Sequence, residues 1–219
     1  FESSTRTLSS FDLSAKNLSM DTNNVSSGGS VSKGESYLDT IQTLDAYNLK
    51  CIIIRCAESG VPEVMARHTR AAIINAGDGW HEHPTQALLD GLTILDHYDG
   101  DVTGKTMTVI GDIMHSRVFG SLVRLAPKLG IQMRVAAPKT FLPAHIEKFG
   151  VDVFHDVEAA LDGVDIVYAL RVQEERGAKG FIPSLREYSK QYGVSKKRLD
   201  LANDNAILMH PGPVRRDID

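Results

Sequence analysis

The chain has 219 residues, of which 42% are hydrophobic and 24% charged, a composition that suits one large or two modest folded domains. Its 24 Lys and Arg against 28 Asp and Glu give a formal net charge of -4, which excludes a general attraction to nucleic acid or anionic lipid. No stretch approaches the roughly 20 apolar residues that a membrane helix needs, and no signal-peptide pattern opens the sequence.

The two cysteines, Cys51 and Cys56, lie in an apolar run without a His or Cys cluster beside them. This spacing fits neither a disulfide framework nor a zinc site, and it favours core thiols in a reducing compartment. We therefore expect a cytoplasmic protein.

Apolar periodicity predicts an alternation of helices and strands along the chain. In chain order, we expect a helix from Ser4 through Leu18, a helix from Tyr37, strands over 51–55 and 72–75, a helix over 84–98, a strand over 107–110, a helix over 117–129, strands over 133–136, 151–154 and 166–169, a helix over 184–192 and a strand over 206–209. The start signals are Pro84 in a first turn and Ser116 and Ser184 as caps.

Alternating strands and helices indicate parallel sheets covered by helices on both faces. The fold class is therefore α/β, with two doubly wound domains, each a parallel sheet flanked by helices. The turn-rich stretch from Asp99 to Gly104 separates them, which gives a first domain over 1–98 and a second over 99–219. The polar stretch from Thr22 to Ser36 reads as a long loop.

The opening segment Ser4-Thr5-Arg6-Thr7 has the chemistry of an anion site. At the start of a helix, free N–H groups, hydroxyls and one guanidinium converge on a single spot that suits a phosphate. For this segment alone, an ordinary N-cap with a surface arginine is the simpler interpretation.

Two further segments place polar groups after strands, namely 76–86, with His81, His83 and Gln86, and the stiff loop His210-Pro211-Gly212-Pro213-Val214. An H-x-H metal pair at His81 and His83 is discounted, because Pro84 opens a helix at once and no further ligands stand ready. The G-x-G-x-x-G spacing of nicotinamide-binding turns is also missing after the strand over 107–110. We expect neither a metal nor a cofactor.

Five motifs together carry a resemblance that spans the whole length. They are Ser-Thr-Arg-Thr at 4–7, Ser-Lys-Gly-Glu at 32–35, His-Pro-Thr-Gln at 83–86, Leu-Arg-Val-Gln-Glu-Glu-Arg at 170–176 and His-Pro-Gly-Pro at 210–213. In order and spacing, the chain resembles aspartate carbamoyltransferase catalytic chains of the aspartate/ornithine carbamoyltransferase superfamily. Since these carry a further helix at each end, the resemblance implies a chain truncated at both ends, without the N-terminal and C-terminal helices.

The resemblance implies transfer of the carbamoyl group of carbamoyl phosphate to L-aspartate, giving N-carbamoyl-L-aspartate and phosphate in pyrimidine synthesis. It implies that Thr7, Arg55, His83 and Lys33 are the catalytic residues. His83 and Thr7 would donate to the carbamoyl oxygen, and Gln86 with the Pro211 carbonyl would hold the carbamoyl NH2 group. The implied carbamoyl-phosphate-binding set is Ser4, Thr5, Arg6, Thr7, Arg55, His83, Gln86 and Pro211.

For aspartate, the resemblance implies two arginine clamps on the carboxylates, and a bidentate guanidinium suits a dicarboxylate. The implied aspartate-binding set is Lys33, Arg117, Arg171, Gln173, Gly212 and Pro213. In the family, the loop of Lys33 reaches into the neighbouring subunit's site, which implies a homotrimer with shared sites. Glu2 would pair with Arg117 and Arg176 when both substrates are bound, and so close the two domains.

Three positions depart from the family pattern, and two alternatives stay open. Leu8 stands where the family frequently has Arg, Asp12 where Glu is usual, and Arg215 where Asn is common. The change at Leu8 puts some phosphate affinity in doubt, and Arg215 adds a cation beside the aspartate site.

The alternatives are ornithine carbamoyltransferase, against which Thr85 and Arg171 argue, and a non-catalytic carbamoyltransferase-like scaffold. A regulatory chain or a dihydroorotase as a partner also stays open.

Overall fold

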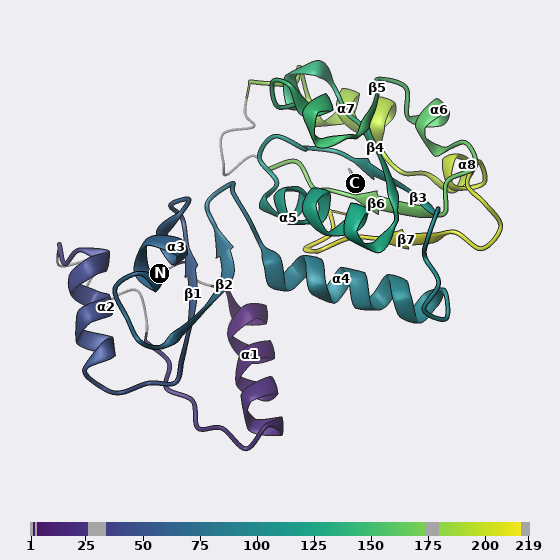
Figure 1. The fold of residues 1–219 in the computed structure, drawn as a ribbon. Helices are drawn as coiled ribbons and strands as arrows, with labels where there is room; N and C mark the ends of the chain where they lie inside the picture. Colours follow the sequence, from purple (N-terminus) through teal and green to yellow (C-terminus); the bar gives the residue numbers. More distant parts are fainter. Residues whose placement is uncertain (1, 3, 26–33, 174–179, 216–219) are drawn as a thin grey trace. The chain divides into compact units, whose positions relative to one another are not determined.

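The computed structural model describes residues 2, 4–25, 34–173 and 180–215 (Figure 1). The chain forms two compact units, Phe1–Thr85 and Gln86–Asp219, which we call unit 1 and unit 2. The division falls at the start of helix α4 (Pro84–His97), whose buried residues Ala87 and Ile94 belong to the core of unit 2. The domain boundary after residue 98 remains a prediction.

Unit 1 contains a parallel pair of strands and three helices. They are α1 (Thr5–Asn17), α2 (Tyr37–Asp45), β1 (Cys51–Cys56), α3 (Val61–Ala66) and β2 (Ala72–Asp78). The register runs from Cys51 opposite Ala72 to Ile54 opposite Asn75, and then shifts so that Cys56 lies opposite Asp78. Strand β2 therefore carries one extra residue near its carboxyl end, and such an irregularity changes the direction in which the side chains there point.

Helix α1 confirms the predicted helix from Ser4 through Leu18, with these two residues as its caps. The Ser4 side chain accepts a hydrogen bond from the backbone N–H of Thr7. No residue of α1 is buried, and Leu8, Leu13 and Leu18 are 53%, 61% and 68% exposed.

Unit 2 is built on a parallel sheet of five strands in the order β5-β4-β3-β6-β7. Its elements after α4 are β3 (Thr106–Ile110), α5 (Arg117–Leu125), the 3-10 helix η2 (Ala126–Leu129), β4 (Gln132–Ala136), η3 (Lys139–Phe141), η4 (Ile146–Phe149), β5 (Asp152–Phe154), α6 (Val157–Leu161), β6 (Ile166–Ala169), α7 (Leu185–Tyr192), α8 (Lys196–Leu199) and β7 (Ile207–Met209). Every predicted strand is present, and the predicted α/β class is confirmed.

Helices cover both faces of this sheet. On one face, the hydroxyl of Thr108 donates to the carbonyl oxygen of Ala160 in α6. On the other face, the hydroxyl of Tyr168 donates to the Asp90 carboxylate in α4. Because successive side chains of a strand alternate between faces, the central strands β3 and β6 are buried on both sides. Unit 2 is therefore doubly wound, as predicted.

The predicted helix over 117–129 differs in its last turn. Helix α5 ends at Leu125 and continues as the 3-10 helix η2, in which Pro127 stands in the first turn. Proline cannot donate the backbone hydrogen bond that an α-helix interior needs, so the chain tightens there. The short helices α3, α6 and α8 were not predicted, because four to six residues give too little periodicity.

Within the described ranges, no helix has both the length and the apolar character required to cross a membrane.

Candidate active site

The amino-terminal end of α1 presents the predicted anion-binding groups. Ser4 Oγ lies 2.9 Å from Thr7 Oγ1 and 3.4 Å from the Thr7 backbone nitrogen. Thr5 and Arg6 are exposed, and Thr7 is half-buried. The free N–H groups of a first helical turn carry a partial positive charge, so this end of α1 has the chemistry to bind a phosphate.

Arg55 lies at the carboxyl end of β1 and connects three segments of unit 1. Its Nη2 pairs with the Glu2 carboxylate at 3.0 Å, and its Nη1 donates to the Ala76 carbonyl oxygen at 3.2 Å. The backbone N–H of Glu2 donates to the Arg55 carbonyl oxygen at 2.9 Å, which holds the chain just before α1 against the end of β1. The structure thus brings Arg55 to the segment that leads into α1.

His83 is the third group at this end of the sheet. Its Nε2 lies 3.4 Å from Arg55 Nη1, and its Nδ1 lies 3.4 Å from Thr85 Oγ1. A guanidinium only donates hydrogen bonds, so Nε2 accepts in this arrangement and the ring proton of a neutral His83 is on Nδ1. For Nε2 to donate to a substrate oxygen, the contact with Arg55 has to give way and the proton has to move to Nε2.

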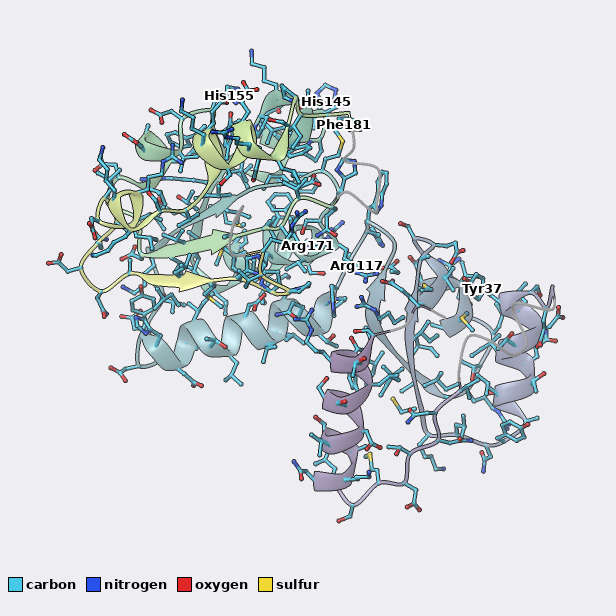
Figure 2. All side chains as sticks on the ribbon, turned by 180° about the vertical axis from the view of Figure 1, so that it is seen from behind. Tyr37, Arg117, His145, His155, Arg171 and Phe181 are labelled. Atoms are coloured by element: carbon cyan, nitrogen blue, oxygen red, sulfur yellow. The ribbon has the colours of Figure 1, made fainter. Side chains whose placement is uncertain are left out.

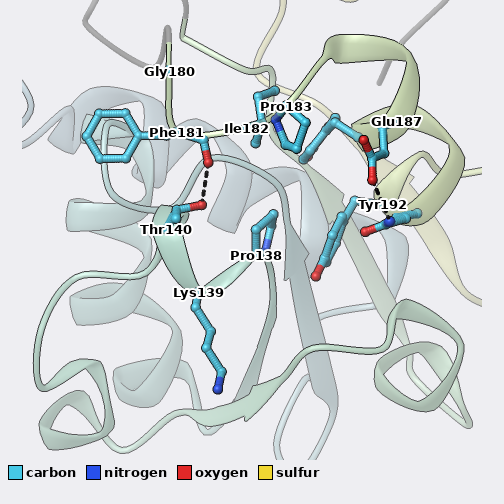
Figure 3. Close-up of a pocket in the computed structure, with 11 residues that line it drawn as sticks. Pro138, Lys139, Thr140, Gly180, Phe181, Ile182, Pro183, Glu187 and Tyr192 are labelled. Atoms are coloured by element: carbon cyan, nitrogen blue, oxygen red, sulfur yellow. Dashed lines mark hydrogen bonds between the residues drawn. The ribbon is translucent and has the colours of Figure 1, made fainter.

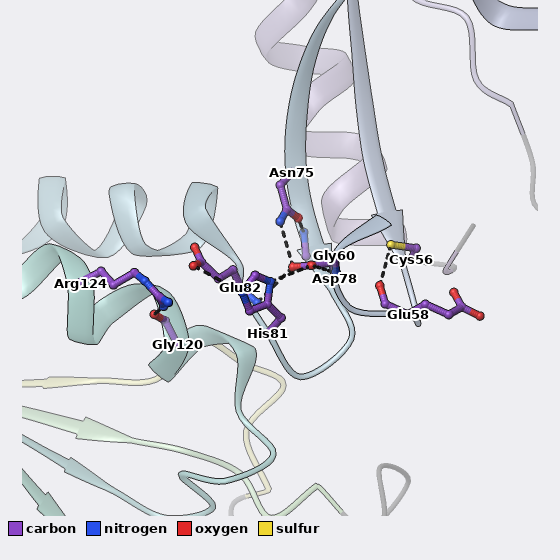
Figure 4. Close-up of polar contacts among 10 residues, drawn as sticks. Cys56, Glu58, Gly60, Asn75, Asp78, His81, Glu82, Gly120 and Arg124 are labelled. Atoms are coloured by element: carbon purple, nitrogen blue, oxygen red, sulfur yellow. Dashed lines mark hydrogen bonds and ion pairs between the residues drawn. The ribbon is translucent and has the colours of Figure 1, made fainter. Parts of the chain in front are cut away.

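The loop that delivers His83 is fixed by the buried carboxylate of Asp78 (Figure 4). Asp78 accepts from the backbone N–H groups of Gly60 at 2.7 Å and Glu82 at 3.1 Å. It also accepts from Asn75 Nδ2 at 2.9 Å and lies 3.0 Å from His81 Nδ1. Burial alone raises the pKa of Asp78, but the hydrogen bonds from Asn75, Gly60 and His81 outweigh it and leave the pKa below its ordinary value.

In unit 2, Arg117 and Arg171 follow the neighbouring strands β3 and β6. Arg117 is the first residue of α5 and is 3% exposed, whereas Arg171 is half-buried and donates to Gln173 Oε1 at 3.2 Å. Both lie at the carboxyl end of the sheet (Figure 2), where ligands bind in open α/β folds. The structure therefore places three of the predicted aspartate-binding residues at the same end of one sheet, with Arg171 and Gln173 in contact.

A turn after β3 fixes the segment of Arg171. Gly111 has φ +129°, and a Cβ there would lie 2.3 Å from the Leu170 carbonyl oxygen, so only glycine fits. The buried Asp112 then accepts from the Gln173 backbone N–H at 3.1 Å and contacts His115 Nδ1 at 2.7 Å. Sequence reasoning assigned Asp112 no role, although its place directly after a buried strand was a usable signal.

The loop after β7 carries the remaining predicted residues. Pro211, Gly212 and Pro213 follow Met209 at the same carboxyl end, because β7 pairs in parallel with β6. The Gly212 backbone N–H donates to His210 Nδ1 at 2.7 Å, which closes the loop locally. Gly212 has φ +63°, a conformation that glycine adopts without strain.

Gln86 stands in the first turn of α4 and is anchored within unit 2. Its Nε2 donates to Asp90 Oδ1 at 2.9 Å, and Asp90 Oδ2 accepts from the Tyr168 hydroxyl at 2.6 Å. Burial raises the pKa of Asp90 to about 6, although both hydrogen bonds favour its ionised form. The sequence analysis assigned no role to Asp90 or Tyr168. The one signal that could have pointed to Asp90 was its four-residue spacing from Gln86 on a predicted helix.

A separate groove of unit 2 has a volume of about 510 Å³ (Figure 3). It lies between the segment after β4 and α7, and the Thr140 hydroxyl donates to the Phe181 carbonyl oxygen at 2.7 Å beside it. Lys139 and Glu187 are its charged lining residues, and none of the predicted site residues that the structure describes lines it. The described site residues instead lie at the start of α1, at the carboxyl end of β1, in the first turn of α4 and in the segments that follow strands.

Two predicted residues, Lys33 and Arg176, lie outside the described residues. Glu2 pairs with Arg55 in this structure, and its pairing with Arg117 and Arg176 on substrate binding stays a prediction. Across the described ranges, no group of three or more His, Cys, Asp or Glu side chains is arranged to hold a metal ion.

Known proteins match this chain along its whole length. The model of the aspartate/ornithine carbamoyltransferase carbamoyl-P binding domain matches residues 1–96, and that of the Asp/Orn binding domain matches residues 103–219. The aspartate carbamoyltransferase catalytic subunits of Granulibacter bethesdensis and Desulforamulus reducens are 48% and 49% identical over 100% of this chain, which covers 69% and 70% of their lengths. A crystal structure of Trypanosoma cruzi aspartate transcarbamoylase with carbamoyl phosphate and aspartate is 32% identical, with a TM-score of 0.82, over 97% of this chain and 71% of that one. The chain therefore belongs to the aspartate/ornithine carbamoyltransferase family.

Proposed function

We propose that this chain is an aspartate carbamoyltransferase, which transfers the carbamoyl group of carbamoyl phosphate to L-aspartate and releases phosphate, in pyrimidine biosynthesis. The observation that carries the proposal is the close contact of Arg55 with His83 at the end of β1, beside the segment that leads into α1. The aspartate carbamoyltransferase relatives, 48% and 49% identical along the whole chain, support the same reaction.

Unit 1 supplies the groups for carbamoyl phosphate. Its phosphate would bind at the first turn of α1, to Ser4, Thr5, Arg6 and Thr7, with Arg55 as a further cation. The half-buried Arg55 is well suited to this task, because it is less hydrated than an exposed arginine and is already oriented by Ala76. Binding of phosphate to Arg55 would compete with the Glu2 carboxylate.

The reaction forms a bond between the aspartate nitrogen and the carbamoyl carbon, and breaks the bond from that carbon to the phosphate oxygen. In between, negative charge develops on the carbamoyl oxygen, and donors aimed at this oxygen lower the barrier. We assign these donors to Thr7, Arg55 and His83. The aspartate amine loses one proton in the process, and the departing phosphate is basic enough to take it.

Unit 2 supplies the groups for aspartate. Arg117 and Arg171 would each bind a carboxylate, with Gln173 orienting Arg171. Gly212 and Pro213 would approach aspartate through the backbone, and Pro211 would accept from the carbamoyl NH2 group. The choice of a dicarboxylate over ornithine rests on these two arginines, because a cationic side chain would be repelled by them.

We further propose a homotrimer in which Lys33 of one subunit serves the site of its neighbour, and a cytoplasmic location. The trimer rests on the resemblance of the segment 32–35 to the family motif. The location rests on Cys51 and Cys56, which are not joined in a disulfide.

A colorimetric assay for carbamoyl-aspartate tests the proposal. The whole natural protein is supplied with carbamoyl phosphate and either aspartate or ornithine. We expect carbamoyl-aspartate with the first and no citrulline with the second. Formation of citrulline alone would establish the ornithine enzyme, and no product from either acceptor would favour the non-catalytic scaffold.

A further inference from the structure

The chain of contacts from Gln86 through Asp90 to Tyr168 links a proposed substrate contact to the centre of the unit 2 sheet. Asp90 is 5% exposed, and Tyr168 is fully buried in the central strand β6. Gln86 and Asp90 stand one turn apart on the same face of α4, which makes the 2.9 Å hydrogen bond between them geometrically natural.

This chain of contacts decides which way the Gln86 amide faces. A carboxylate accepts hydrogen bonds and cannot donate, so the group that Gln86 turns toward Asp90 must be its NH2. The carbonyl oxygen Oε1 is then directed away from Asp90 as an acceptor. Without a pure acceptor at position 90, the two ends of the amide would be nearly equivalent, and Gln86 would present either an oxygen or an NH2 group.

We propose that Asp90 is a positioning residue for the carbamoyl group: it holds Gln86 so that Oε1 accepts from the carbamoyl NH2, while Tyr168 fixes Asp90 itself. The inference rests on the proposed function, since it assigns the partner of Gln86 as the carbamoyl amide. It predicts that the site discriminates an NH2 group from a methyl group of similar size.

The burial of Asp90 supports this role. Desolvation disfavours the ionised carboxylate and raises its pKa to about 6. The two hydrogen bonds favour the ionised form but do not compensate fully for this effect. Since an apolar side chain facing the sheet would avoid this penalty, packing alone does not explain an aspartate here. The need for a fixed hydrogen-bond acceptor beside Gln86 does explain an aspartate at this position.

The test compares two ligands that differ only at the proposed contact. Carbamoyl phosphate carries an NH2 group where acetyl phosphate carries a methyl group, so the ratio of their dissociation constants, measured by titration calorimetry on the whole protein, reports the contact with Gln86. We expect Asp90→Ala to weaken carbamoyl phosphate binding about 10-fold and to change acetyl phosphate binding less than about 2-fold.

A double-mutant cycle separates positioning from a general structural effect. Gln86→Met should lower the carbamoyl preference as Asp90→Ala does, and adding Asp90→Ala to Gln86→Met should lower it no further. If Asp90→Ala weakens both ligands equally, or if the two effects multiply, the inference is overturned. If the unaltered protein binds acetyl phosphate but not carbamoyl phosphate, the proposed function fails first.

Two more variants guard against a folding defect. In Asp90→Asn, the side chain keeps its size but either its oxygen or its NH2 can face Gln86, because the Tyr168 hydroxyl can donate to the oxygen or accept from the NH2, so the preference should fall. In Asp90→Asn with Tyr168→Phe, no partner fixes the Asn amide, so the preference should fall at least as far, by up to about 10-fold. Tyr98→Phe is the matched control, because Tyr98 anchors the far end of α4 through the Asp165 and Asn205 carbonyl oxygens at 2.8 and 3.1 Å. It should leave the preference unchanged, and equal losses in the control and the double variant would contradict the inference.

Discussion

The two units hold their proposed site residues by different means. In the described part of unit 1, the core cluster consists of Ile41, Ile54, Cys56 and Met65, and the site residues are fixed by polar contacts of Arg55 and Asp78. In unit 2, a far larger apolar core lies on both faces of five strands, and the site residues follow directly from those strands.

This difference indicates which kind of change each unit tolerates. The contacts of the half-buried Arg55 can be removed with a modest loss of stability, because water can replace the missing partner, whereas removal of the buried Asp78 carboxylate would leave its donors unpaired. Backbone and core changes in unit 2 act on closely packed atoms that cannot relax. Variants of Arg55 in unit 1 should therefore separate activity from stability, and backbone variants next to the core of unit 2 should not.

Arg55→Ala offers the largest expected effect and the strongest test of this contrast. We expect kcat for carbamoyl-aspartate formation to fall about 10²- to 10³-fold, as for the loss of one donor to a developing oxyanion. The free energy of unfolding in urea should change by less than about 2 kcal/mol. The control is Arg67→Ala, which removes an exposed ion pair with Glu63 in the same unit. Activity within about 10-fold of the unaltered protein would remove Arg55 from the proposed chemistry.

Gly111→Ala tests the packing of unit 2. A Cβ at this position would lie 2.3 Å from the Leu170 carbonyl oxygen, at a φ of +129°. We expect the free energy of unfolding to fall by roughly 2–4 kcal/mol. The rate should also no longer saturate with aspartate, because a shift of Leu170 would displace Arg171, the next residue and a proposed aspartate ligand. Gly100→Ala is the matched control, with φ +86° and nothing within 4 Å of the added Cβ, and should cost about 1 kcal/mol. Equal losses in the two variants would show that the turn after β3 can relax.

Asp90→Asn gives a pH-dependent prediction for stability. Burial raises the pKa of Asp90 from 3.8 to about 6, so the folded state holds the proton more tightly than the unfolded chain does. Stability from this group is therefore present at pH 4 and is lost as the pH rises through 6. Between pH 4 and 7.5, the variant should gain roughly 2 kcal/mol relative to the unaltered protein, measured by urea unfolding at each pH. A difference independent of pH would mean that the Asp90 carboxyl titrates normally.

Glu2→Ala carries the smallest expected effect. If Glu2 pairs with Arg117 once both substrates are bound, its loss should raise the aspartate concentration for half-maximal rate by about 5-fold, or roughly 1 kcal/mol. Carbamoyl phosphate binding should stay unchanged or tighten, because Glu2 no longer occupies Arg55. Equal weakening of both ligands would contradict a role for Glu2 in aspartate binding.

Much of the fold followed from local patterns. The capping serines Ser4, Ser116 and Ser184 each accept from the backbone N–H three residues on, as predicted. The strands were predictable because buried parallel strands are short apolar runs. The order β5-β4-β3-β6-β7 was not predicted, since it depends on which strands pair across long stretches of chain.

The sequence by itself determined the elements, the α/β class and the motif residues that end up at the strand ends, because periodicity and capping act within a few residues. Only the tertiary structure decided the partners: Glu2 beside Arg55, and Tyr168 beside Asp90, 78 residues away along the chain. The physical reason is that a hydrogen bond between distant residues exists only once sheet register and helix packing bring their side chains within about 3 Å.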